Sequence, residues 1–191
     1  SPDLGVGPVE TALTRDLIPA LEATWPLRPG RASRVAAGLS MGGYGALRLA
    51  AHRPEVFAAA AGLSPAVIPD LPEDPPALAE ALDEKQRRLF GSAYGQPLDP
   101  ARFNAQNVFR PLAALAGRPE PPVFYLSVGD DDYFGLWRGT LLLFLALRDA
   151  GLTAELRVVD GDHVWPLWRR ELAGALRFLD AAMATGDPRA N

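Results

Sequence analysis

Apolar positions recur at helical spacing in some stretches of the chain and form short uninterrupted runs in others. Val9, Leu13, Leu17, Ile18 and Leu21 recur at helical spacing, which predicts a helix over residues 9–25 that ends before Pro26. The same criteria predict helices over 42–53, 76–90, 137–150 and 165–183, and buried strands over 33–39, 56–63, 123–128 and 154–159. Because strands alternate with helices, we expect parallel βαβ units, and hence an α/β sandwich with a mostly parallel sheet.

The chain has a length suited to one domain. With 191 residues, 48% of them hydrophobic, it can bury a sizeable core, and we expect a single domain over 1–184 and a flexible tail over 185–191. The segment 65–117 is longer than an ordinary connection in an α/β protein. Because it leaves the carboxyl edge of the predicted sheet, where ligands bind, we expect either a lid or cleft wall, or a solvated crossover.

Charge and composition exclude several classes of partner. The formal net charge is −4 and the 19 basic residues are scattered, so neither nucleic acid nor an anionic membrane surface is an expected partner. The longest apolar run, 141–147, is too short to span a bilayer. Cysteine is absent, which excludes disulfides and thiolate chemistry and fits either a cytoplasmic or a secreted protein. The Arg- and Ala-rich composition is of a bacterial type.

A nucleophile motif stands between a predicted strand and a predicted helix. Residues 38–42 read Gly-Leu-Ser-Met-Gly, the G-x-S-x-G pattern that presents a serine at a sharp strand-to-helix turn. We expect glycine at 38 and 42 because a Cβ two positions from the strained Ser40 would crowd the turn. The N–H of Met41 is the predicted donor to the oxyanion of a tetrahedral intermediate.

A serine hydroxyl needs a base, and the chain has two histidines. His52 lies late in the helix after the nucleophile, where it is expected to be a surface residue at the helix end, remote from Ser40. His163 follows the last predicted strand at the same sheet edge as Ser40. His163 is therefore the predicted general base.

The acid that orients the histidine is expected after a strand between serine and histidine. Asp130, Asp131 and Asp132 follow the strand over 123–128 directly; we favour Asp132, with Asp131 as the alternative. Asp160, Asp162 and His163 could join the trio as metal ligands, but their spacing is unlike that of calcium loops, so no metal is predicted. The aromatic residues of both loops are expected to pack in the core or, for Phe134 and Trp137, to line a substrate pocket.

Residues 37–46, Ala-Gly-Leu-Ser-Met-Gly-Gly-Tyr-Gly-Ala, closely resemble the nucleophile segment of the esterase D-like family of α/β hydrolases. The resemblance continues through 52–57, 129–132, 161–165 and Trp168. It implies an α/β-hydrolase fold, acyl-ester chemistry without a cofactor, and a triad of Ser40, Asp132 and His163. The implied substrate is a small-molecule or carbohydrate-linked ester.

The sequence departs from the family before residue 9, where members have several further strands. In the family, a loop of that region supplies a second oxyanion donor, and one of its strands pairs with the strand that leads into the nucleophile. We therefore expect either additional residues before Ser1 or a sheet edge covered by a partner or by a second copy.

The leading hypothesis is a serine esterase that works through an acyl-serine intermediate. A serine peptidase is an alternative because Gly-x-Ser-x-Gly-Gly-Tyr also resembles prolyl-oligopeptidase catalytic domains. An acyltransferase would use the same triad with an alcohol as the acceptor. An inactive binding module of this fold is disfavoured, because all three triad positions hold competent residues.

Overall fold

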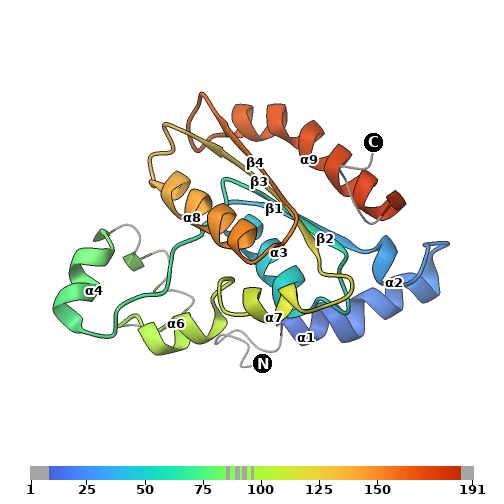
Figure 1. Cartoon of the computed structure of the whole chain (residues 1–191), viewed down its shortest axis with the longest axis horizontal. Helices are drawn as coiled ribbons and strands as arrows, with labels where there is room; N and C mark the ends of the chain where they lie inside the picture. Colours follow the sequence, from blue (N-terminus) through green and yellow to red (C-terminus); the bar gives the residue numbers. More distant parts are fainter. Residues whose placement is uncertain (1–8, 85–86, 89–90, 92–93, 96, 186–191) are drawn as a thin grey trace. The chain divides into compact units, whose positions relative to one another are not determined.

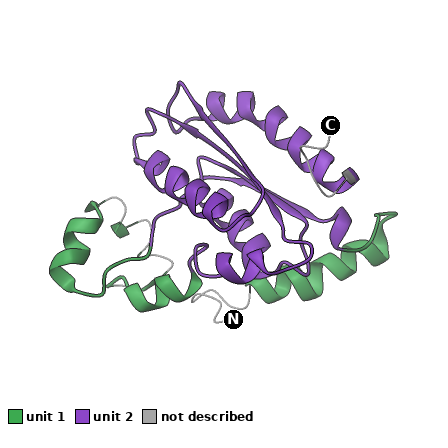
Figure 2. Cartoon of the chain, viewed as in Figure 1, with its two compact units in different colours: residues 1–30, 70–106 green, residues 31–69, 107–191 purple. Residues whose placement is uncertain are grey.

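The computed structural model describes residues 9–84, 87–88, 91, 94–95 and 97–185. The chain divides into two compact units, coloured green and purple in Figure 2. Unit 1 comprises residues 1–30 and 70–106, and unit 2 comprises residues 31–69 and 107–191. The expectation of one domain over 1–184 stays a prediction.

Unit 2 is built around a four-stranded sheet. Its strands are β1 (Val35–Leu39), β2 (Ala59–Leu63), β3 (Val123–Gly129) and β4 (Ala154–Val159), which are all parallel and lie in the order β1-β2-β3-β4. The parallel sheet is therefore confirmed, and its carboxyl ends share one edge. Two predicted strands begin too early: residues 31–33 form a 3-10 turn (η2), and Val56 and Phe57 donate main-chain N–H groups to the Arg53 carbonyl in a turn.

Helices cover both faces of this sheet. In Figure 1, α3 (Ser40–His52) and α8 (Leu136–Asp149) lie on one face and α9 (Trp165–Thr185) lies on the other. The short helix α7 (Leu112–Ala116) precedes β3. These helices confirm the α/β sandwich, with α9 ending two residues later than predicted and residues 186–191 of the expected tail outside the described residues.

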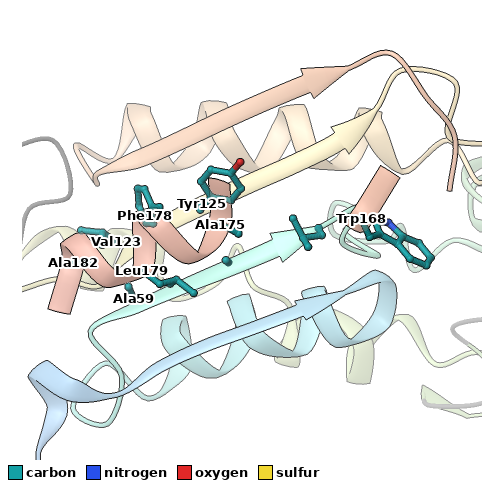
Figure 3. Close-up of a cluster of buried hydrophobic side chains, with 10 residues drawn as sticks. Ala59, Val123, Tyr125, Trp168, Ala175, Phe178, Leu179 and Ala182 are labelled. Atoms are coloured by element: carbon teal, nitrogen blue, oxygen red, sulfur yellow. The ribbon is translucent and has the colours of Figure 1, made fainter. Parts of the chain in front are cut away.

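The core on the α9 face follows the two-residue period of the strands. Alternate residues of β2 and β3 pack with α9 in the cluster drawn in Figure 3, which comprises Ala59, Ala61, Leu63, Val123, Tyr125, Trp168, Ala175, Phe178, Leu179 and Ala182. Gly62 points to the opposite face, where an added Cβ would lie 2.8 Å from the Leu47 side chain of α3. Small residues in β2 thus let both helix layers approach the sheet closely.

Unit 1 contains the helical stretch predicted over 9–25. The stretch is confirmed, but it consists of α1 (Val9–Thr11), a six-residue π-helix η1 (Ala12–Leu17) and α2 (Ile18–Thr24). Pro19 lies just after the junction of η1 and α2, inside this continuous helical stretch, and has no N–H to donate to the preceding turn. The apolar spacing does not distinguish the π-helical turn from an α-helical one.

The prediction of one helix over 76–90 is wrong. Helix α4 (Pro75–Ala81) ends at Leu82, which has an extended backbone. The guanidinium of Arg87 donates to the carbonyls of Ala79 and Leu82 at 3.0 and 2.6 Å, so the side chain satisfies groups that a continuous helix would have paired internally. Residues 85–86 and 89–90 of the predicted helix lie outside the described residues.

A further helix of unit 1, α6 (Pro100–Gln106), was not predicted. Its signal is the pair Asp99-Pro100: the Asp99 carboxylate accepts from the Arg102 N–H at 3.1 Å, as an N-cap followed by proline should. Within the described residues, every helix is too short or too polar to cross a membrane.

Strands β1 and β4 are the two outer strands of the sheet in the described residues. Along β1, Ala37 is exposed and its neighbours are half-buried. Coverage of this edge by a partner or a second copy stays a prediction.

Candidate active site

Ser40 occupies a sharp turn between β1 and α3. Its φ of +53° lies in the left-handed region, which a residue with a Cβ rarely adopts. A Cβ added to Gly38 would lie closer than 3.0 Å to main-chain atoms of both Gly42 and Gly43, so the expected need for glycine at 38 is confirmed. The same expectation for Gly42 is wrong, because an added Cβ there meets nothing within 4 Å. The tight second glycine is Gly43, whose Cβ would lie 3.0 Å from the Gly38 carbonyl oxygen.

Met41 follows Ser40 in the first turn of α3, where a helix has no internal acceptors for its N–H groups. Met41 is 47% exposed as a residue. The position agrees with the predicted oxyanion donor, and the role stays a prediction.

His163 lies in the loop between β4 and α9, beside Ser40. Its Nε2 is 2.9 Å from Ser40 Oγ, and its Nδ1 is 2.7 Å from Asp132 Oδ2. Because a carboxylate only accepts, Nδ1 carries the proton and Nε2 accepts from the serine hydroxyl. The structure thus brings together three residues that are 31 and 92 positions apart in the chain.

The carboxylate beside His163 belongs to Asp132 and not to Asp131. The Asp132 side chain is fully buried, and its Oδ1 accepts from the Phe134 N–H at 3.0 Å. Asp131 is exposed, and its N–H donates to the Gly161 carbonyl at 3.1 Å. Asp132 begins a turn in which the Gly135 N–H donates to its carbonyl at 2.8 Å.

Three exposed carboxylates, those of Asp130, Asp131 and Asp160, converge within 4.8 Å. Neither Asp162 nor His163 belongs to this group. Asp130 Oδ1 accepts from the Gly161 N–H at 3.1 Å, which links the loop after β3 to the loop after β4. Exposed acidic clusters are common in proteins without a metal, so this group carries no argument for one.

Aromatic rings surround the imidazole of His163. The rings of Phe134 and Trp168 stand almost perpendicular to it, with centroids 5.0 and 4.9 Å away. The Trp168 indole N–H donates to Ser64 Oγ at 3.1 Å. Ser64 is buried, has a φ of +42° and directly follows β2. It was not predicted as a site residue, although its place after a strand at the sheet's carboxyl edge is a signal.

His52 is the last residue of α3, as expected. It lies twelve positions after Ser40, roughly 18 Å along a helix. Its Nε2 lies 3.1 Å from the carbonyl oxygen of buried Asn107, which ties the end of α3 to the segment before α7.

Comparisons with known proteins find esterases among those similar to this chain. An acetyl esterase of Caldicellulosiruptor saccharolyticus is 28% identical over 168 residues, which are 86% of this chain and 60% of that protein. Two solved structures resemble the structure of this chain. A ferulic acid esterase has a TM-score of 0.68 and 23% identity, and the match covers 95% of this chain and 64% of that protein. A fluorophosphonate-binding serine hydrolase of Staphylococcus aureus has a TM-score of 0.63 and 21% identity, and the match covers 86% of this chain and 60% of that protein. The likeness establishes the α/β-hydrolase fold.

The chain spans about 60% of the length of these relatives. The profile of one family, described as putative esterase, matches residues 8–179, which include the strand-to-helix turn at Ser40 and the loop that carries His163. The chain therefore belongs to the putative esterase family.

Proposed function

We propose that the protein hydrolyses a carboxylic ester through an acyl-serine intermediate. The observation that carries the proposal is the continuous chain of hydrogen bonds from Ser40 Oγ to His163 Nε2, at 2.9 Å, and from His163 Nδ1 to Asp132 Oδ2, at 2.7 Å. Membership of the putative esterase family supports it.

In the proposed mechanism, Ser40 Oγ attacks the ester carbonyl carbon while Nε2 of His163 takes the hydroxyl proton. The imidazolium then donates this proton to the departing alcohol. In the second step, water attacks the acyl-serine while His163 takes its proton, and the carboxylic acid leaves as that proton passes to Ser40 Oγ. Asp132 holds the imidazole in the required tautomer. Because its carboxylate is fully buried, its attraction for the imidazolium is weakly screened by solvent.

The negative oxygen of the tetrahedral intermediate would be stabilised by the Met41 N–H at the start of α3. A single such donor contributes about 3 to 4 kcal/mol of transition-state stabilisation. This donor is supplied by the main chain, so substitution of the exposed Met41 side chain should leave it in place.

The proposed substrates are esters of small molecules or of carbohydrates, and the names of the acetyl esterase and the ferulic acid esterase make acetyl and feruloyl the first acyl groups to test. A panel of aryl esters with acyl chains of increasing length would identify the acyl preference. A dipeptidyl amide and an added alcohol acceptor in the same panel test for peptidase and acyltransferase activity.

The first test is intact-protein mass after treatment with a fluorophosphonate, which reacts with an activated serine. We expect one adduct on the wild-type protein and none on Ser40→Ala or His163→Ala. Well-folded wild-type protein without an adduct would contradict the proposal and favour a binding module.

A further inference from the structure

Asp162, the residue before the proposed base His163, accepts hydrogen bonds from the main-chain N–H groups of His163 and of the residue after it. One carboxylate oxygen, Oδ1, accepts from the N–H of His163 at 2.6 Å, and the Asp162 carbonyl accepts from the N–H of Val164 at 2.9 Å. The peptide groups that flank the His163 Cα are therefore both hydrogen-bonded to Asp162. This arrangement limits rotation of the backbone that carries the imidazole.

The same carboxylate oxygen also reaches the loop that carries the triad acid. Asp162 Oδ1 accepts from the N–H of Tyr133 at 2.9 Å, and Tyr133 is the residue directly after Asp132. One oxygen atom thus connects the main chain at the proposed base with the main chain next to the proposed acid. Shared acceptors of this kind fix two loops relative to each other, because moving either loop breaks a charge-assisted hydrogen bond.

We propose that Asp162 is a positioning residue for the His163–Asp132 pair, an inference that rests on the proposed ester hydrolysis. Its carboxylate keeps the imidazole aligned so that Nε2 stays within hydrogen-bond distance of Ser40 Oγ. It acts through main-chain N–H groups, and takes no proton during the reaction.

Two substitutions at Asp162 distinguish its role as a hydrogen-bond acceptor from an effect of its negative charge. In Asp162→Asn the amide oxygen can still accept from both N–H groups, whereas Asp162→Ala removes the acceptor. Misplacement of a catalytic group by about 1 Å costs on the order of 10²-fold in rate. We therefore expect a kcat about 10- to 100-fold lower in Asp162→Ala with KM within about twofold, and a kcat within about threefold of wild type in Asp162→Asn.

Asp160→Asn is the matched control. Asp160 lies in the same loop and carries the same charge, and Arg170 binds its main-chain carbonyl, at 2.7 Å, rather than its carboxylate. Loss of the Asp160 carboxylate should leave kcat within about twofold of wild type, because no link between the two loops described above uses it. Thermal unfolding of all variants checks that they fold.

A second readout does not depend on hydrolysis. The proton between His163 Nδ1 and Asp132 should give a ¹H NMR resonance downfield of the amide region, which His163→Ala removes. We expect this resonance in wild type and Asp162→Asn, and its broadening or loss in folded Asp162→Ala.

The proposal is overturned if Asp162→Ala keeps wild-type kcat and the resonance, or if Asp162→Asn is as impaired as Asp162→Ala. Failure of the ester hydrolysis itself would be recognised separately, as wild-type protein that shows the resonance but neither turns over esters nor reacts with a fluorophosphonate.

Discussion

The two glycines of the G-x-S-x-G pattern should respond oppositely to alanine. A Cβ on Gly38 would lie 2.8 Å from the main-chain nitrogen of Gly43 and closer still to main-chain atoms of Gly42, against about 3.4 Å for ordinary contact. These atoms belong to the backbone of α3 and have no rotamer with which to move away, so the turn must shift by 0.6 Å or more. Overpacking of this kind costs about 3 kcal/mol, near the upper end of its usual range.

Gly42→Ala meets no such obstacle, because an added Cβ has no atom within 4 Å and the φ of Gly42 is not positive. Alanine in place of glycine in a helix stabilises the folded state by up to about 1 kcal/mol, and we expect about 0.5 kcal/mol in the first turn. The two variants should therefore differ by about 3.5 kcal/mol in free energy of unfolding, a factor of a few hundred in the equilibrium constant.

Urea unfolding followed by tryptophan fluorescence measures this difference, and fluorophosphonate labelling reports whether Ser40 remains reactive. Gly42→Ala should be labelled at close to the wild-type rate, and Gly38→Ala much more slowly. Equal destabilisation by the two substitutions would show that both glycines are needed for the same conformational reason, and would contradict a crowded position 38 and an open position 42.

Three other substitutions test the packing of unit 2. Trp168→Phe removes the donor to Ser64 Oγ, and because Ser64 is buried we expect urea unfolding to show a loss of about 1 to 2 kcal/mol; an unchanged stability would show that another donor replaces the indole. Burial raises the pKa of the Tyr125 phenol above its ordinary value of 10.0, so the unfolded chain ionises first and stability should fall as the pH rises from 10 through the folded-state pKa. Tyr125→Phe should reduce that fall in a pH series of unfolding curves, and an identical slope in both proteins would count against the buried phenol as its source. Gly139→Ala would place a Cβ closer than 3.0 Å to the main chain of Val67, so its thermal midpoint should drop by several degrees, and an unaltered midpoint would contradict the close helix-to-loop contact.

Periodicity was sufficient to predict the α/β class and most elements of unit 2. Strands β2 and β3 are apolar at almost every position, and the helices that flank them bury one face only, so hydrophobic burial alone produces the pattern that was used. One failure, the predicted helix over 76–90, lies where a side chain replaces main-chain partners. At Leu82 the guanidinium of Arg87 accounts for the end of α4, and such a tertiary contact leaves no period in the sequence.

In the candidate site, too, some residues could be predicted from the order of the strands, whereas others depend on contacts that only the folded chain makes. Ser40 and His163 could be predicted because each follows a strand at the sheet's carboxyl edge, a consequence of topology. The role of Gly42 was mispredicted because the pattern assigns equal weight to both glycines, whereas the direction of each Cβ differs along the turn.

The sequence alone does not show which of Asp130, Asp131 and Asp132 directs its carboxylate towards the histidine. In the structure each carboxyl group has a different environment: Asp130 accepts from the Gly161 N–H, Asp131 is exposed, and Asp132 is buried against the imidazole. The difference arises at the tight turn after β3, where the Asp132 carboxylate is buried while those of Asp130 and Asp131 stay at the surface, so that like charges are not placed together in the interior. A run of three acids therefore yields one buried carboxylate, and the hydrogen bonds between the loops after β3 and β4 decide which one faces the base.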